Sequence, residues 1–112
     1  MKTEFLIYRP GVMLPEIQTL DVAEEPIYAE IRRIMRPWLG DETAEVERVN
    51  VLFRTARPDM FVDDRGALKS LAVNDAATLI YHEASRAARR RTKPNMNQIH
   101  GVAIISLRPI WF

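Results

Sequence analysis

The sequence contains no cysteine and only two histidines, His82 and His100. Without thiols there is no disulfide framework, no thiolate nucleophile and no cysteine-ligated zinc site, which excludes several classes of enzyme and metal-binding domain. The two histidines share no metal-ligand spacing, and the position where a zinc-protease helix would carry its second histidine is Arg86. We therefore expect no metal and no cofactor.

Glycine and long apolar runs are also scarce. The four glycines are isolated and form no phosphate-binding loop, and no serine has the glycine pattern of a nucleophile elbow. An enzyme built on His82 or His100 would need a nucleophile, a base and an orienting group that the sequence does not display. At the N-terminus the apolar run at residues 5–8 is too short for a signal-peptide core, and no segment approaches the ~20 residues of a membrane span. We expect a non-enzymatic, cytoplasmic protein with no membrane partner.

Charge is distributed unevenly, although the net charge is only +1. Residues 1–64 carry a net charge of −5, and residues 65–112 carry +6. One short segment holds five basic residues with no acid among them: Arg86, Arg89, Arg90, Arg91 and Lys93. Such a run is typical of the solvated C-terminal end of a helix, whose dipole favours cations, and a surface for an anionic partner is the alternative interpretation. The sequence supports both interpretations.

The 112 residues are enough for one core, so residues 1–112 are expected to form a single α+β domain. Apolar periodicity predicts helices that begin near residues 26 and 75, and strands at residues 3–9, 16–22, 46–53, 60–62, 67–73 and 101–107. The resulting order is ββαβββαβ. We expect a mixed or mostly antiparallel sheet of about five to six strands, with the helices on one face.

Particular residues are expected to shape these elements. Pro37 should limit the first helix, and Gly40 should supply a left-handed turn after it. The interrupted alternation between Val46 and Val49 predicts a β-bulge or a late strand start near Arg48.

The clearest turn signal is at residues 63–66, where Gly66 is free to take a positive φ. Asp63 and Asp64 are interpreted as turn formers rather than as an acid/base pair. Asn74 is expected to cap the second helix, which should run to about residue 90.

Residues 63–74 read Asp-Asp-Arg-Gly-Ala-Leu-Lys-Ser-Leu-Ala-Val-Asn, and a glycine-led apolar segment follows at residues 99–104. Together with the strand that ends in Pro10-Gly11, this arrangement resembles a family of small phage- and plasmid-borne proteins, domain of unknown function 3846. The family's usual proline before the asparagine is Ala72 here, and the basic extension through Lys93 exceeds the family's usual connection. The resemblance implies an accessory protein of a mobile genetic element and assigns no catalytic residue.

The leading functional hypothesis is a non-enzymatic interaction module, an accessory protein of a phage or other mobile element that binds a host protein. The alternative is a nucleic-acid-binding protein in which the basic end of the second helix contacts phosphates. No aromatic cluster on adjacent strands favours stacking of bases, so this alternative involves no reading of base sequence.

The last three residues, Ile110, Trp111 and Phe112, are all large and apolar, and we expect them to be packed. In one arrangement they close the core of the domain itself. In the other, Trp111 is a buried anchor for a foreign partner or for a second copy, which would make a homodimer.

Overall fold

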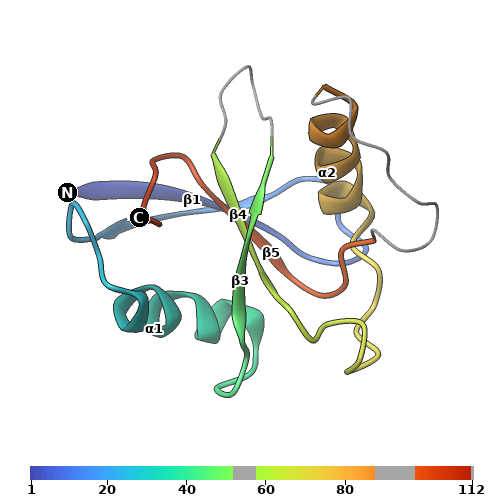
Figure 1. The fold of residues 1–112 in the computed structure, drawn as a ribbon, viewed down its shortest axis with the longest axis horizontal. Helices are drawn as coiled ribbons and strands as arrows, with labels where there is room; N and C mark the ends of the chain where they lie inside the picture. Colours follow the sequence, from blue (N-terminus) through green and yellow to red (C-terminus); the bar gives the residue numbers. More distant parts are fainter. Residues whose placement is uncertain (52–57, 88–97, 112) are drawn as a thin grey trace.

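The computed structural model describes residues 1–51, 58–87 and 98–111 (Figure 1). Its elements follow in the order β1 (Lys2–Tyr8), β2 (Glu16–Asp21), α1 (Tyr28–Leu39), β3 (Val46–Asn50), β4 (Asp59–Asp63), α2 (Asp75–Ala87) and β5 (Ala103–Ser106). The predicted α+β class, with two helices and a sheet of five strands, is confirmed.

The five strands form one sheet in the order β2-β1-β5-β4-β3, and every neighbouring pair is antiparallel. β5 lies at the centre, as its unbroken apolar run indicates. It is flanked by β1 and β4, which are buried over most of their length. β2 and β3 are therefore the two edges of the sheet.

The helices cover opposite faces of the sheet (Figure 1). On one face, sheet residues and α1 form a buried cluster, the α1-face cluster, which includes Phe5, Ile7, Ile31, Ile34, Met35, Phe61 and Ile104. On the other face, sheet residues and α2 form a second buried cluster, which includes Leu6, Met60, Ala76, Ala77 and Ile105. The expectation that both helices lie on one face is wrong, because the inner strands carry apolar residues on both faces and each face needs a cover.

The bulge expected near Arg48 is also absent from the β3–β4 pair. Pairing runs without interruption from Val46 opposite Asp63 to Asn50 opposite Asp59. Val46 packs in the cluster on the α1 face, whereas Val49 packs in the cluster on the α2 face. The alternation slips in the sequence because Val46 and Val49 pack on opposite faces of the sheet, not because a residue is inserted.

Pro37 lies inside α1, which continues to Leu39, so the prediction that it limits the helix is wrong. The two residues after Pro37, Trp38 and Leu39, pack against the α1-face cluster, and this contact favours the continuation of the helix beyond Pro37. Gly40 ends the helix with φ of 76°, as predicted, and its N–H donates to the Arg36 carbonyl at 3.0 Å.

The strand expected at residues 67–73 does not form, so the observed order is ββαββαβ. Residues 64–70 are turns, Ser70 takes a φ of 56°, and only Val73 pairs, in an isolated bridge with His100. Gly66 ends the predicted turn without the positive φ expected of it. A Cβ there would lie 2.6 Å from the His100 carbonyl oxygen, so glycine is needed for the close approach of two backbones.

Candidate functional site

A shallow hollow of about 470 Å³ lies beside the first half of β3, and Trp111 is one of its walls. We call it the β3 hollow. Its lining residues come from four parts of the chain: Tyr28, Glu45, Val46, Glu47, Arg48, Asp64 and Trp111. The first turn of α1, the start of β3, the end of β4 and the C-terminal segment therefore meet here.

Two aromatic rings form the apolar wall of the β3 hollow. The rings of Tyr28 and Trp111 meet edge to face, with centroids 5.2 Å apart and an interplanar angle of 76°. The Tyr28 hydroxyl donates to the Val46 carbonyl at 3.0 Å, and Trp111 lies 6.1 Å from the buried Phe61 ring. The rings are thus held by β3 and by the core beneath them.

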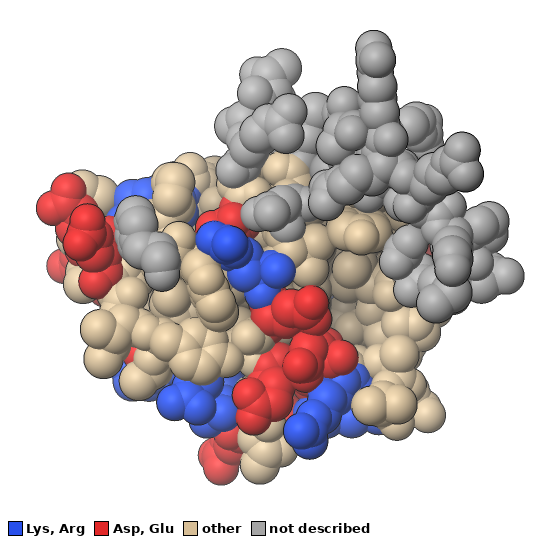
Figure 2. All heavy atoms as spheres, viewed as in Figure 1, with Lys and Arg blue, Asp and Glu red and all other residues tan. Residues whose placement is uncertain are grey.

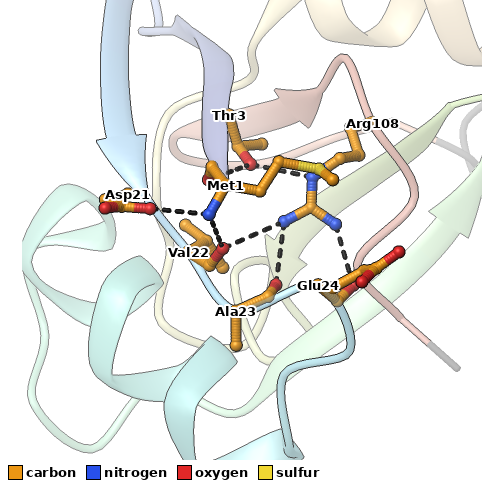
Figure 3. A network of polar contacts seen from close by, with 7 residues as sticks. All are labelled: Met1, Thr3, Asp21, Val22, Ala23, Glu24 and Arg108. Atoms are coloured by element: carbon orange, nitrogen blue, oxygen red, sulfur yellow. Dashed lines mark hydrogen bonds and ion pairs between the residues drawn. The ribbon is translucent and has the colours of Figure 1, made fainter.

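Arg108 holds the C-terminal segment that carries Trp111 (Figure 3). Its guanidinium donates to the Thr3 hydroxyl at 2.9 Å and to the carbonyls of Ala23 and Glu24, each at 2.8 Å. Beyond it, Ile110 is fully buried and Trp111 is half-buried against the α1-face cluster. For these two residues the first predicted arrangement, packing on the domain's own core, is confirmed; Phe112 lies outside the described residues.

Three exposed acidic residues also line the β3 hollow: Glu45, Glu47 and Asp64. The Asp64 N–H donates to the Glu45 carbonyl at 2.9 Å, which holds two of them on neighbouring strand ends. Among the described residues, no cation lies within ion-pair distance of any of the three. In Figure 2 acidic side chains gather in the lower centre of the face, where Figure 1 places the start of β3, with basic side chains nearby.

Two arginines lie against the aromatic rings and not beside the carboxylates of Glu45, Glu47 or Asp64. The Arg48 guanidinium is 5.6 Å from the Trp111 ring centroid, and that of Arg32 is 4.8 Å from the Tyr28 centroid. Arg48 also lies 4.0 Å from Asp59. Burial raises the pKa of Asp59, and Arg48 opposes this shift only in part. The ring faces therefore already have cations beside them, whereas the three carboxylates do not.

The predicted basic segment is largely outside the described residues. Arg86 lies in the last turn of α2, and Arg89, Arg90, Arg91 and Lys93 belong to residues 88–97, which the structure does not describe. The nucleic-acid interface predicted from these residues stays a prediction.

Two of the residues weighed for catalysis, His100 and Asp63, bind main-chain groups with their side chains. The His100 Nδ1 donates to the Leu71 carbonyl at 3.0 Å. Asp63 forms the predicted turn, because its carboxylate accepts the Arg65 N–H at 3.0 Å. Within the described ranges there is no group of three or more potential metal ligands, and no helix there is long and apolar enough to cross a membrane.

Most of the β3 hollow was missed by sequence reasoning, which singled out Trp111 and, as a turn former, Asp64. Tyr28 and the residues at 45–48 have no shared spacing with Trp111, and only the β3–β4 pairing and the path of the C-terminal segment bring them together. No protein-family model, curated protein or solved structure matches the chain.

Proposed function

We propose that this protein is a non-enzymatic interaction module whose β3 hollow binds a basic segment of a partner protein. A Lys or Arg side chain of the partner lies among Glu45, Glu47 and Asp64, and its aliphatic stem packs on the edges of Tyr28 and Trp111. The observation that carries the proposal is the coincidence of an ordered aromatic pair with three carboxylates that have no cationic partner among the described residues.

Charge and shape support the same class of ligand. The three carboxylates and Arg48 leave the lining of the hollow with a net negative charge, which attracts cations and opposes anions. Arg48 and Arg32 already lie beside the rings, so an incoming cation is attracted to the carboxylates rather than to a ring face. Long basic side chains suit this arrangement because they join an apolar stem to a charged head.

The hollow is also built on rigid elements. Tyr28 is held by its hydrogen bond to the Val46 carbonyl, and Trp111 by the segment that Arg108 fixes. Binding therefore requires little ordering of the rings, which reduces the entropic cost of association.

Selection from a random linear peptide library on the intact protein tests this proposal. We expect enriched peptides to carry Lys or Arg beside an apolar residue and to lose at least tenfold in affinity to a Glu45→Gln, Glu47→Gln, Asp64→Asn triple variant. The matched control removes the same number of charges outside the hollow, in a Glu25→Gln, Glu42→Gln, Glu83→Gln triple variant, because these three exposed acids do not line it.

Two results would contradict the proposal. One is enrichment of acidic or uncharged peptides. The other is equal binding of basic peptides to the two triple variants, which would mean that general surface charge, and not the hollow, attracts them.

Two expectations from the sequence are part of this proposal. The protein is an accessory protein of a phage or other mobile element that binds a host protein, and it acts in the cytoplasm. Phosphate binding through the basic segment remains the alternative.

A further inference from the structure

The hydrogen bonds between β2 and β1 determine which backbone groups of β2 are unpaired at the free edge of the sheet. Met1 and Val22 exchange two bonds, since the Val22 N–H donates to the Met1 carbonyl and the Met1 nitrogen to the Val22 carbonyl, both at 2.9 Å. In an antiparallel pair such mutual bonds recur at every second residue. With the observed register, residues 16, 18 and 20 bond to β1, whereas Ile17, Thr19 and Asp21 direct their N–H and C=O groups away from it.

Large exposed apolar side chains lie in β2 and in the connection that leads into it. Val12, Met13 and Leu14 in the β1–β2 connection are 51%, 58% and 80% exposed, and Ile17 in β2 is 63% exposed. β2 itself contains no lysine or proline, the residues that commonly protect an edge strand from further pairing. Apolar surface of this kind beside unpaired backbone groups is typical of an interaction surface.

We propose that β2 pairs with β2 of a second copy of this chain in antiparallel orientation, which joins the two sheets into one of ten strands. The contact lies at the sheet edge opposite β3, so the dimer leaves both β3 hollows accessible. The inference is independent of the proposed function, because it uses none of the residues that line the hollow.

The two-fold symmetry of an antiparallel β2–β2 pair determines which residues oppose each other, and it keeps the two acidic residues of β2 from pairing with one another. A two-fold axis that relates neighbouring antiparallel strands is normal to the sheet, so residues that directly oppose each other lie on the same face and have the same parity. Glu16 and Asp21 have opposite parity, and therefore they never oppose each other directly across the axis. The odd residues of β2 are Ile17, Thr19 and Asp21, with Asp21 at the end of the strand. Ile17 and Thr19 form the mutual bonds at the centre of the contact; neither is charged, and both residue types suit a strand.

Amide hydrogen exchange of the intact protein, followed by NMR at increasing concentration, tests the proposal. In the monomer, the amides of Ile17 and Thr19 should exchange rapidly, whereas those of Gln18 and Leu20 are protected by β1. In the dimer, the amides of Ile17 and Thr19 should become at least tenfold slower to exchange. A chain that stays monomeric at millimolar concentration, or a dimer in which these two amides still exchange rapidly, would overturn it.

Two variants locate the contact. Thr19→Pro removes an N–H that makes no bond in the monomer, and Ile17→Lys adds a charge at the centre of the interface; each should weaken dimerisation at least tenfold in sedimentation measurements. Leu79→Lys is the matched control, because Leu79 is 59% exposed but lies on α2. If Thr19→Pro impairs folding, Ile17→Lys gives the test alone. Equal dimerisation of Ile17→Lys and Leu79→Lys would contradict the proposal.

Discussion

The side-chain amide of Asn74 donates a hydrogen bond of 2.8 Å to the main-chain carbonyl of Tyr8, across 66 positions in the sequence. The same nitrogen donates to the Gly101 carbonyl at 2.9 Å, and the side-chain oxygen accepts the Ala77 N–H at 3.1 Å. The predicted helix cap is thus confirmed. The fully buried Asn74 also joins the end of β1, the start of α2 and the segment that leads into β5.

We predict that Asn74→Ser destabilises the protein nearly as much as Asn74→Ala. Serine retains a capping oxygen, so a residue that acts only as a cap would tolerate the change with little loss, whereas its removal costs about 1 kcal/mol. Both variants remove the two buried hydrogen bonds from the side-chain amide to the carbonyls of Tyr8 and Gly101, and each such bond contributes about 0.5–1.5 kcal/mol. Urea unfolding measures the difference, and a serine variant as stable as the wild type would limit Asn74 to its capping role.

Lys69 links two carboxylates, with its Nζ 2.6 Å from an oxygen of Asp41 and 2.6 Å from one of Asp63. The hydrogen bond from Lys69 holds the pKa of Asp41 well below its ordinary value, and the bond to Asp41 raises the pKa of Lys69. The Asp41 contribution to stability is present above the unfolded carboxyl value of about 4, and it is lost as the pH falls through the lower folded pKa. The Lys69 contribution is present below the unfolded value of about 10.4, and it is lost as the pH rises through the higher folded pKa.

We therefore predict that the difference in unfolding free energy between the wild type and Lys69→Met is largest between about pH 4 and pH 10 and decreases at both extremes. Urea unfolding across the pH range measures it. Lys2→Met is the control, because Lys2 is an exposed lysine with no ion pair among the described residues. A difference that does not vary with pH would contradict the assignment.

Arg108 is predicted to position Trp111 through the carbonyls that it binds. Arg108→Met should lower the melting temperature and shift the emission of Trp111 to longer wavelength, because the C-terminal segment loses its bonds to Thr3, Ala23 and Glu24. Emission should be recorded in a Trp38→Phe background, since Trp38 is the other tryptophan. Unchanged emission at unchanged stability would mean that core packing of Ile110 alone holds the segment.

Any nucleic-acid binding should depend on phosphate contacts from the basic segment. Replacing Arg89, Arg90 and Arg91 with glutamine should weaken binding to every DNA sequence and reduce its dependence on salt. Fluorescence anisotropy with a labelled duplex at several salt concentrations measures both effects. Unchanged affinity in the triple variant would exclude this segment as the contact, and no binding at low salt would exclude the nucleic-acid alternative.

Local patterns in the sequence predicted most elements of the fold. The unbroken apolar run at residues 101–107 indicated a central strand, and Asn74 before a helical period indicated a cap, because each signal lies within a few residues. The opposite placement of the helices and the regular pairing of β3 depend on which face each strand residue occupies, and that is set by the whole sheet. Tyr28 and Trp111 lie 83 positions apart in the sequence and meet only through tertiary packing, so no local pattern indicates their contact.

Titration of the isotopically labelled intact protein with N-acetyl-arginine amide, followed by NMR, tests most directly whether the β3 hollow holds a basic side chain. We expect the indole N–H of Trp111 and the backbone amides of residues 45–48 to shift together along one saturable curve, and N-acetyl-glutamate amide to leave them unchanged. Shifts spread over unrelated carboxylates such as Glu42 and Glu83, with the Trp111 indole unaffected, would contradict the proposed function.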